Sequence, residues 1–198
     1  MKNAKITIVF YSVFVIFFFA AIYAFPILLL YAESESEQSE KTSTLPDYEL
    51  KAGFIRTFAN FCEWPPNSTV ANPDVPFIIG ALEENDVTAV LTEKTKNRRI
   101  GGKQTKILII ADDNEIKNCN LLYISGISEK RLQKILEIVG NLPILTVSDI
   151  PDFEEKGVMI NMFNVGKNIR FNVNLVATRK NGLQLNSKIL RFAIVIIQ

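Results

Sequence analysis

The stretch GVMINMFNVGKNIRFNVNLVATRKNGLQLNSKILRFA, residues 157–193, carries the densest structural information in the chain. Two runs within it, 158–163 and 169–173, are rich in apolar and β-branched side chains, which is typical of strands. They are joined across a Gly-Lys-Asn turn at 166–168. A connection this short forces antiparallel pairing, so the sequence predicts a β-hairpin.

Two helices are expected after this hairpin. A short helix over residues 174–179 should end at the Asn-Gly pair that follows it, because Asn-Gly is a common helix stop. Asn186 or Ser187 suits the N-cap of a last helix, since either side chain can accept a backbone hydrogen bond. That helix would present an apolar face formed by Ile189, Leu190, Ala193, Ile194 and Ile197.

Strand and helix patterns alternate before the hairpin. Buried strands are expected at 77–82, 106–110, 121–124 and 144–147. Helices are expected at 47–62, at 86–91 and between Ser128 and Gly140. This alternation predicts the α/β class, as a layered α/β sandwich in which helices flank a mixed sheet of about six strands. The predicted domain covers residues 45–198.

The first predicted helix carries many aromatic side chains. Phe54, Phe58 and Phe61 widen its apolar stripe, and Trp64 precedes the two prolines that end it. Such a cluster is typical of a core face. Phe58, Phe61 and Trp64 are also candidates to line a groove for a ligand or a partner.

The first 32 residues have the features of an export signal. A basic start precedes a long apolar run, and a small residue stands at each candidate cleavage point, Ala24 or Ala32. The run is also long enough for an uncleaved membrane anchor. Residues 1–32 are therefore predicted to be a signal peptide or an N-terminal anchor, and the acidic stretch 33–44 a polar linker. Both alternatives place the globular part across a membrane.

The composition lacks the commonest catalytic side chain, histidine. The chain has no histidine, the commonest general base and metal ligand, so an enzyme is disfavoured, and no catalytic residue, metal site or cofactor is predicted. Its 22 basic and 21 acidic residues give a net charge of +1, so no general attraction to nucleic acid is expected. The basic stretch at 94–99 also lacks the stacking aromatics of a nucleic-acid site.

One acidic residue, Asp149, follows a predicted strand directly. Ligand sites in open α/β sheets lie at the carboxyl ends of strands. The Ile-Pro-Asp sequence after Asp149 is equally typical of a turn and a helix cap, so both interpretations stay open.

Cys62 and Cys119 are the only cysteines in the sequence. In an oxidising compartment a disulfide between them would close a loop of roughly 60 residues and contribute a few kcal/mol. The alternative is that Cys62 is a small buried residue on the apolar face of the first helix.

Five segments in order along the domain are similar to one known family. They are LKAGFIRTFANFCEWP (50–65), FIIGAL (77–82), CNLLYIS (119–125), PILTVSDIPDF (143–153) and the closing GVMINMF and IRFNVNLVATRKNGLQLNSKILRFA (157–193). With these markers the chain resembles the YfiR family of bacterial periplasmic proteins. The resemblance implies an α/β sandwich that acts as a non-catalytic regulator. The characterised type binds and represses the periplasmic part of a membrane-bound diguanylate cyclase, YfiN. An outer-membrane lipoprotein, YfiB, relieves that repression, so that cyclic di-GMP and biofilm formation rise.

The resemblance also implies a partner surface on the closing hairpin and the helix after it, formed by Ile160, Phe163, Asn172 and Thr178. Asn172 stands where many relatives have an acidic residue, and Thr178 where they have an apolar one. These differences put a shared contact chemistry in question. The cysteine pairs of the family have no counterpart in the strand at 77–82 or near the hairpin, so its disulfides do not carry over.

The expected function is therefore that of a periplasmic or membrane-anchored regulator. Its expected partners are the periplasmic domain of a membrane-bound diguanylate cyclase or other sensor, an outer-membrane lipoprotein, and a second copy of itself in a possible homodimer. The alternative is a periplasmic module that binds an aromatic metabolite in the groove around Phe58, Phe61 and Trp64.

Overall fold

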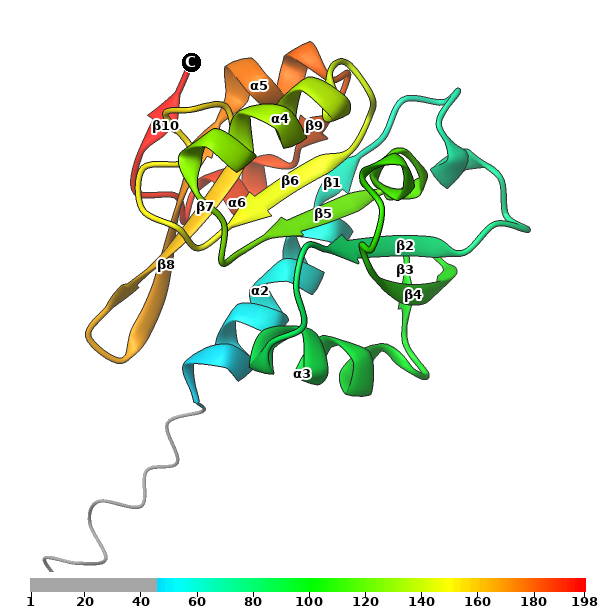
Figure 1. The fold of residues 1–198 in the computed structure, drawn as a ribbon, viewed down its shortest axis with the longest axis horizontal. Coiled ribbons are helices and arrows are strands. Elements are labelled where there is room, and N and C mark those ends of the chain that lie inside the picture. The colour runs from blue at the N-terminus through cyan, green and yellow to red at the C-terminus, as the bar shows by residue number, and fades with distance from the viewer. Residues whose placement is uncertain (1–45) are drawn as a thin grey trace, which may run out of the picture. The chain divides into compact units, whose positions relative to one another are not determined.

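The computed structural model describes residues 46–198 (Figure 1). The predicted signal peptide or anchor at 1–32 and the predicted linker at 33–44 lie outside these residues. Within 46–198, no helix combines the length and the hydropathy that crossing a membrane requires.

Strands and helices alternate along the described residues. The helices are α2 (Asp47–Asn60), α3 (Asp86–Thr95), α4 (Glu129–Val139), α5 (Leu175–Lys180) and α6 (Ser187–Leu190), with 3₁₀ turns η1 (Thr69–Ala71) and η2 (Asp113–Asn118). The strands are β1 (Cys62–Glu63), β2 (Phe77–Ala81), β3 (Arg99–Ile100), β4 (Lys103–Ile109), β5 (Leu121–Ile124), β6 (Leu145–Ser148), β7 (Ile160–Val165), β8 (Asn168–Asn174), β9 (Gln184–Leu185) and β10 (Ile196–Ile197).

An eight-stranded mixed sheet forms the centre of the fold, in the order β10-β8-β7-β6-β5-β2-β4-β3 (Figure 1). The five strands from β4 to β7 run parallel, while β3 and β8 pair antiparallel with β4 and β7. β1 and β9 pair separately as a two-stranded ribbon. This architecture confirms the predicted α/β sandwich with a mixed, helix-flanked sheet, and it has more strands than expected.

The sheet separates two apolar cores. The first core packs α2 and α3 against one face, and it includes Phe58, Leu91 and Phe171. The second core packs α4 and η2 against the other face around Ile116 and Leu132. Central strands are buried on both faces, as the continuous apolar run LLYI of β5 requires.

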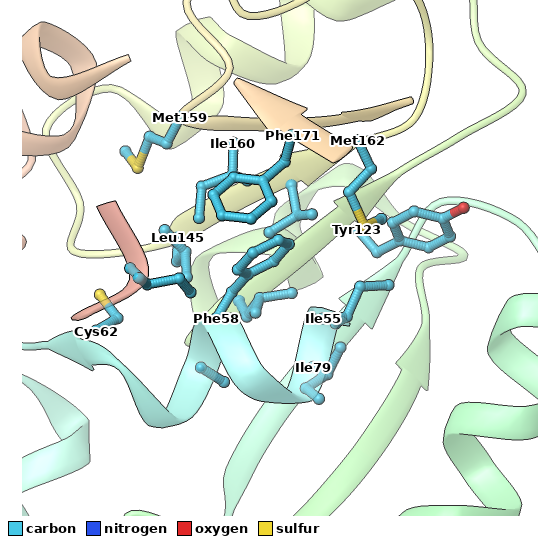
Figure 2. Packing of buried hydrophobic residues seen from close by; sticks show 14 of the residues in the cluster. Ile55, Phe58, Cys62, Ile79, Tyr123, Leu145, Met159, Ile160, Met162 and Phe171 are labelled. Atoms are coloured by element: carbon cyan, nitrogen blue, oxygen red, sulfur yellow. The ribbon is translucent and has the colours of Figure 1, made fainter. Parts of the chain in front are cut away.

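Phe58 lies at the centre of the first core and is completely buried (Figure 2). Its ring meets that of Phe171 at 5.0 Å in an edge-to-face arrangement, which joins α2 to β8. Phe54 contacts both rings from one turn earlier in α2. Truncating Phe58 to alanine would cost about 3–5 kcal/mol of stability, because the surrounding core cannot collapse fully into the space.

The helix caps follow the sequence. Ser128 accepts a hydrogen bond from the backbone of Arg131 and begins α4, and Gly140 ends it with a positive φ of 51°. Asn85 begins α3 through a capping box with Thr88. α3 runs to Thr95, so it is longer than the predicted 86–91 and takes up part of the expected basic connector.

The C-terminus differs from the prediction of a long last helix. Asn186 caps α6 as expected, but this helix ends at Leu190, and Ile196–Ile197 forms β10, parallel to β8 at the sheet edge. The reason is the run Ile-Val-Ile-Ile at 194–197, because β-branched side chains lose rotamer freedom in a helix and suit a strand. The first helix is also shorter than expected, since Cys62 belongs to β1.

Candidate functional site

Polar side chains meet at the edge of the sheet where the parallel strands end. Asp149 follows β6, and its Oδ2 accepts hydrogen bonds from the Tyr123 hydroxyl at 3.0 Å and from Lys51 Nζ at 2.8 Å. Lys51 also pairs with Asp47 at 3.2 Å, and Asn164 of β7 donates to the same Asp47 carboxylate. Figure 2 shows the Tyr123 hydroxyl at the margin of the apolar cluster. We call these five residues the edge network.

The edge network holds elements together, and the two donors to Asp149, Lys51 and Tyr123, are unsuited to act as bases. Burial opposes the charge of Lys51, but hydrogen bonding and the charge of Asp149 outweigh it and raise the pKa of the amine. Burial and then the charge of Asp149 raise the pKa of the Tyr123 phenol. Both groups therefore remain protonated donors at neutral pH, and neither can act as a base. Asp149 thus has a structural role, but as the acceptor of Lys51 and Tyr123 and not as a helix cap, since no helix follows it before β7.

A second group of polar side chains lies at the ends of β2 and β5. The strand that follows β2 in the parallel sheet, β4, lies on one side of β2, and the next strand, β5, lies on its other side. Open α/β sheets bind their ligands at such switch points. Here the Asn85 amide donates to Ser125 Oγ at 3.0 Å. The Glu83 carboxylate lies so close over Gly126 that a Cβ has no room there. The protein's own polar side chains thus contact one another at the position where such folds bind ligands.

The C-terminal segment is basic and exposes apolar side chains. Residues 157–198 contain no aspartate or glutamate, and their basic residues are Lys167, Arg170, Arg179, Lys180, Lys188 and Arg191. The large apolar side chains exposed in the same segment are Val165, Val176, Phe192, Ile194 and Val195. Phe192, at 65%, is the most exposed large apolar side chain of the described residues. Exposed apolar groups that gather together mark interaction sites more often than single ones do.

Three of these residues lie together where the chain joins the sheet edge. Phe192, Ile194 and Val195 lead into β10, the outermost strand (Figure 1). The Ile194 amide donates to the Phe171 carbonyl at 3.0 Å, and the Val195 amide donates to Asn172 Oδ1 at 3.2 Å. We call Phe192, Ile194, Val195 and the outer edge of β10 the C-terminal surface. It is the best candidate for a partner contact among residues 46–198.

The predicted partner residues divide between core and surface. Ile160 and Thr178 are both 0% exposed, so the expectation that they contact a partner does not hold in this conformation. Ile160 points into the first core (Figure 2), and the Thr178 hydroxyl donates to the Asn174 carbonyl at 2.7 Å. Phe163 is partly exposed near the hairpin tip. Asn172 is half-buried, and its Oδ1 accepts a hydrogen bond from the backbone just before β10. It therefore has a structural role next to the C-terminal surface.

The predicted last helix places Ile194 on its apolar face and gives Phe192 and Val195 no role, so that prediction does not point to this surface. The signal that could have found them is the β-branched sequence at 194–197, which favours a short edge strand. With a strand at 196–197 and a helix that ends at Leu190, residues 191–195 form a connection, and Phe192, Ile194 and Val195 are exposed in it.

The predicted aromatic groove around Phe58, Phe61 and Trp64 is not formed. Phe58 is completely buried, and Phe61 is partly buried against the same core. Trp64 packs edge-to-face on Phe77 at 5.3 Å and donates its indole N–H to the Pro143 carbonyl at 3.0 Å. The cavity beside Trp64 measures about 200 Å³, below the range of about 300–1,000 Å³ typical of ligand pockets, and neither phenylalanine lines it.

Of the two alternatives for the cysteines, the structure shows buried thiols and no disulfide. Cys62 and Cys119 are both free and buried, and they belong to the first and the second core on opposite faces of the sheet. Cys119 Sγ packs on Gly80, where a Cβ would collide with it. Burial raises the pKa of the Cys62 thiol, and it raises that of Cys119 to about 12. In the part of the chain that the structure describes, no three cysteine or carboxylate side chains gather as metal ligands.

The sequence profile of a family described as YfiR/HmsC-like matches residues 48–194 of the chain. No curated protein matches the chain. Two solved structures align with the chain at 10% identity. One is the ABC domain in complex with L-Trp from Streptococcus pneumonia, with a TM-score of 0.47 over 72% of this chain. The other is a conserved domain protein from Vibrio cholerae O1 biovar El Tor strain N16961, with a TM-score of 0.48 over 77% of this chain. The alignments cover 60% of each of those chains, so this protein spans less than two thirds of their length.

Proposed function

Because the chain belongs to the YfiR/HmsC-like family, we propose that it is a non-catalytic periplasmic regulator that binds and represses a membrane-bound sensor, a diguanylate cyclase. The match over residues 48–194 is the observation that carries this proposal. The export segment predicted at 1–32 agrees with it, because such a segment would bring the domain to the periplasm.

The C-terminal surface supports a function in protein contact. Phe192 offers a large aromatic side chain of the kind that dominates interface energies when a partner covers it. The outer edge of β10 offers unpaired backbone groups, which an extended partner segment can extend as a further strand. Since residues 157–198 carry only basic charges, the partner surface is expected to be acidic around an apolar centre.

Repression would follow from unequal binding to two receptor conformations. A regulator that binds the inactive receptor about tenfold more tightly than the active one shifts the equilibrium by about 1.4 kcal/mol toward the inactive state. An outer-membrane lipoprotein that binds the same surface would relieve repression by competition. A second copy of the chain on this surface would have the same effect, so the active form would be the one with the surface free.

The test is deletion of the gene in a strain that carries a linked cyclase, followed by measurement of cyclic di-GMP and surface attachment. Both should rise and return to normal with the wild-type gene. The double variant F192S/I194S should fail to restore repression. Its matched control is Ile109→Ser, which changes a side chain 40% exposed on β4, near the opposite edge of the sheet. Unchanged cyclic di-GMP after deletion would contradict the proposal.

A further inference from the structure

A groove of about 650 Å³ lies between α2 and α3, far larger than the cavity beside Trp64. Its volume falls within the range of about 300–1,000 Å³ typical of small-molecule sites. Leu50 and Phe54 give it an apolar wall. The remaining lining residues are polar, charged or glycine: Glu49, Gly53, Arg56, Thr57, Glu93, Lys94, Asn97 and Arg98.

Two guanidinium groups of this groove lack a counter-ion. Within residues 46–198 neither Arg56 nor Arg98 forms an ion pair with a carboxylate, and the covered Nε of Arg56 has no hydrogen-bond partner. Burial and then the charge of Arg98 lower the pKa of Arg56. Holding a partly covered cation beside a like charge costs free energy, and a bound anion would remove that cost.

The nearby carboxylates do not neutralise these arginines. Glu49 is already paired with Lys94 at 2.6 Å. Glu93 is exposed on α3 and forms no ion pair within the described part of the chain. The lining has one net positive charge, because it contains three basic residues (Arg56, Lys94 and Arg98) and two acidic ones (Glu49 and Glu93).

Gly53 keeps the groove open in the middle of α2. Its backbone is helical, and a Cβ placed there would meet no atom within 4 Å, so neither φ nor packing calls for glycine. Glycine inside a helix is unfavourable relative to alanine. Its presence at this position is explained if a side chain would occupy space that a ligand uses.

We propose that the groove between α2 and α3 binds a small organic anion, a carboxylate or a phosphate monoester with an apolar group, through Arg56 and Arg98. Planar guanidinium groups suit both anions because each can donate two parallel hydrogen bonds. The apolar group of the ligand lies against Leu50 and Phe54. This site is separate from the C-terminal surface, and it does not depend on the proposed regulatory function.

The experiment measures binding to the purified protein by calorimetry and by the shift in melting temperature. Phenyl phosphate and benzoate, tested separately, distinguish the two anions. Benzyl alcohol lacks the charge, and inorganic phosphate lacks the apolar group. At least one aromatic anion should raise the melting temperature at millimolar concentration, because a ligand of the native state stabilises it. Benzyl alcohol should give no shift, and inorganic phosphate a smaller one than phenyl phosphate.

The double variant R56Q/R98Q should weaken binding of the aromatic anion at least tenfold. Gly53→Leu should block it by filling the groove, and circular dichroism confirms that each variant is folded. Lys96→Gln removes an exposed positive charge that does not line the groove and should leave binding unchanged. Absence of binding by both aromatic anions, or equal binding to R56Q/R98Q and the wild type, would overturn the proposal.

Discussion

Lys51 Nζ lies 2.8 Å from Asp149 Oδ2, and this contact joins the first helix to the end of a strand 98 residues further along the chain. Tyr123 donates to the same oxygen at 3.0 Å, so α2, β5 and β6 meet at one carboxylate. The side chains of Lys51 and Asp149 are only 15% and 16% exposed, so salt screens their attraction less than it screens a surface pair. The placement of α2 therefore depends on Asp149.

Replacing Asp149 with alanine should lower the free energy of unfolding by about 2 kcal/mol, because two donors lose a charged acceptor. Urea unfolding followed by circular dichroism measures the change. Asp74→Ala is the matched control, since that carboxylate is exposed and forms no ion pair with the described residues. Equal stability of the two variants would show that the edge network does not hold α2.

The stability of the protein should fall in alkali, and part of the fall should come from Tyr123. Lys51 and Tyr123 both have raised pKa values in the folded state. Their stabilisation is fully present below the unfolded pKa values, about 10 for tyrosine and about 10.4 for lysine, and it is lost as pH rises through the folded values. The free-energy difference between wild type and Tyr123→Phe should therefore shrink above about pH 10. Urea unfolding between pH 8 and pH 11 follows this trend, and a constant difference would contradict it.

Both thiols should be unreactive in the native protein. Cys62 and Cys119 are free and buried, and burial raises the pKa of each thiol, so little thiolate is exposed at neutral pH. Ellman's reagent should detect them only after unfolding, and dithiothreitol should leave the melting temperature unchanged. Absence of free thiols in the unreduced, unfolded protein would show that a disulfide had formed.

Gly53→Ala should raise the free energy of unfolding by about 0.5–1 kcal/mol, because alanine loses less backbone entropy in a helix and meets no neighbour here. Gly140→Ala should have the opposite effect, by about 1–3 kcal/mol, because a positive φ of 51° strains any side chain. Thermal and urea unfolding of both variants test this pair. A destabilised Gly53→Ala variant would mean that α2 needs its glycine for packing.

The elements that the sequence predicted well are those with local signals. The turn at Gly166 allows only antiparallel pairing, and the hairpin formed as expected. β7 begins and ends two residues later than predicted, and β8 extends one residue further at each end. Ser128 and Gly140 bounded α4 because capping chemistry is local. The prediction for the C-terminal run was wrong because its apolar spacing fits both a helix and a strand. The pairing with β8, which selects the strand, is not a local interaction.

The candidate site was harder to predict for the same reason. The burial of Thr178 depends on the packing of α5 onto the sheet, and the local sequence does not specify that packing. The pairing of Lys51 with Asp149 and the meeting of Arg56 with Arg98 join segments far apart in the chain. Periodicity reports which face of an element is apolar, but it does not report which element will face it.

The edge network also has a mechanical consequence. Asp47 is the first residue of α2, and it bonds both to Lys51 within the helix and to Asn164 in the central sheet. Tension applied through the chain before α2 would therefore reach the sheet through side-chain bonds at the first helical turn. In single-molecule pulling from a handle attached at Pro46, the first turn of α2 should detach at lower force once Asn164 is replaced by alanine.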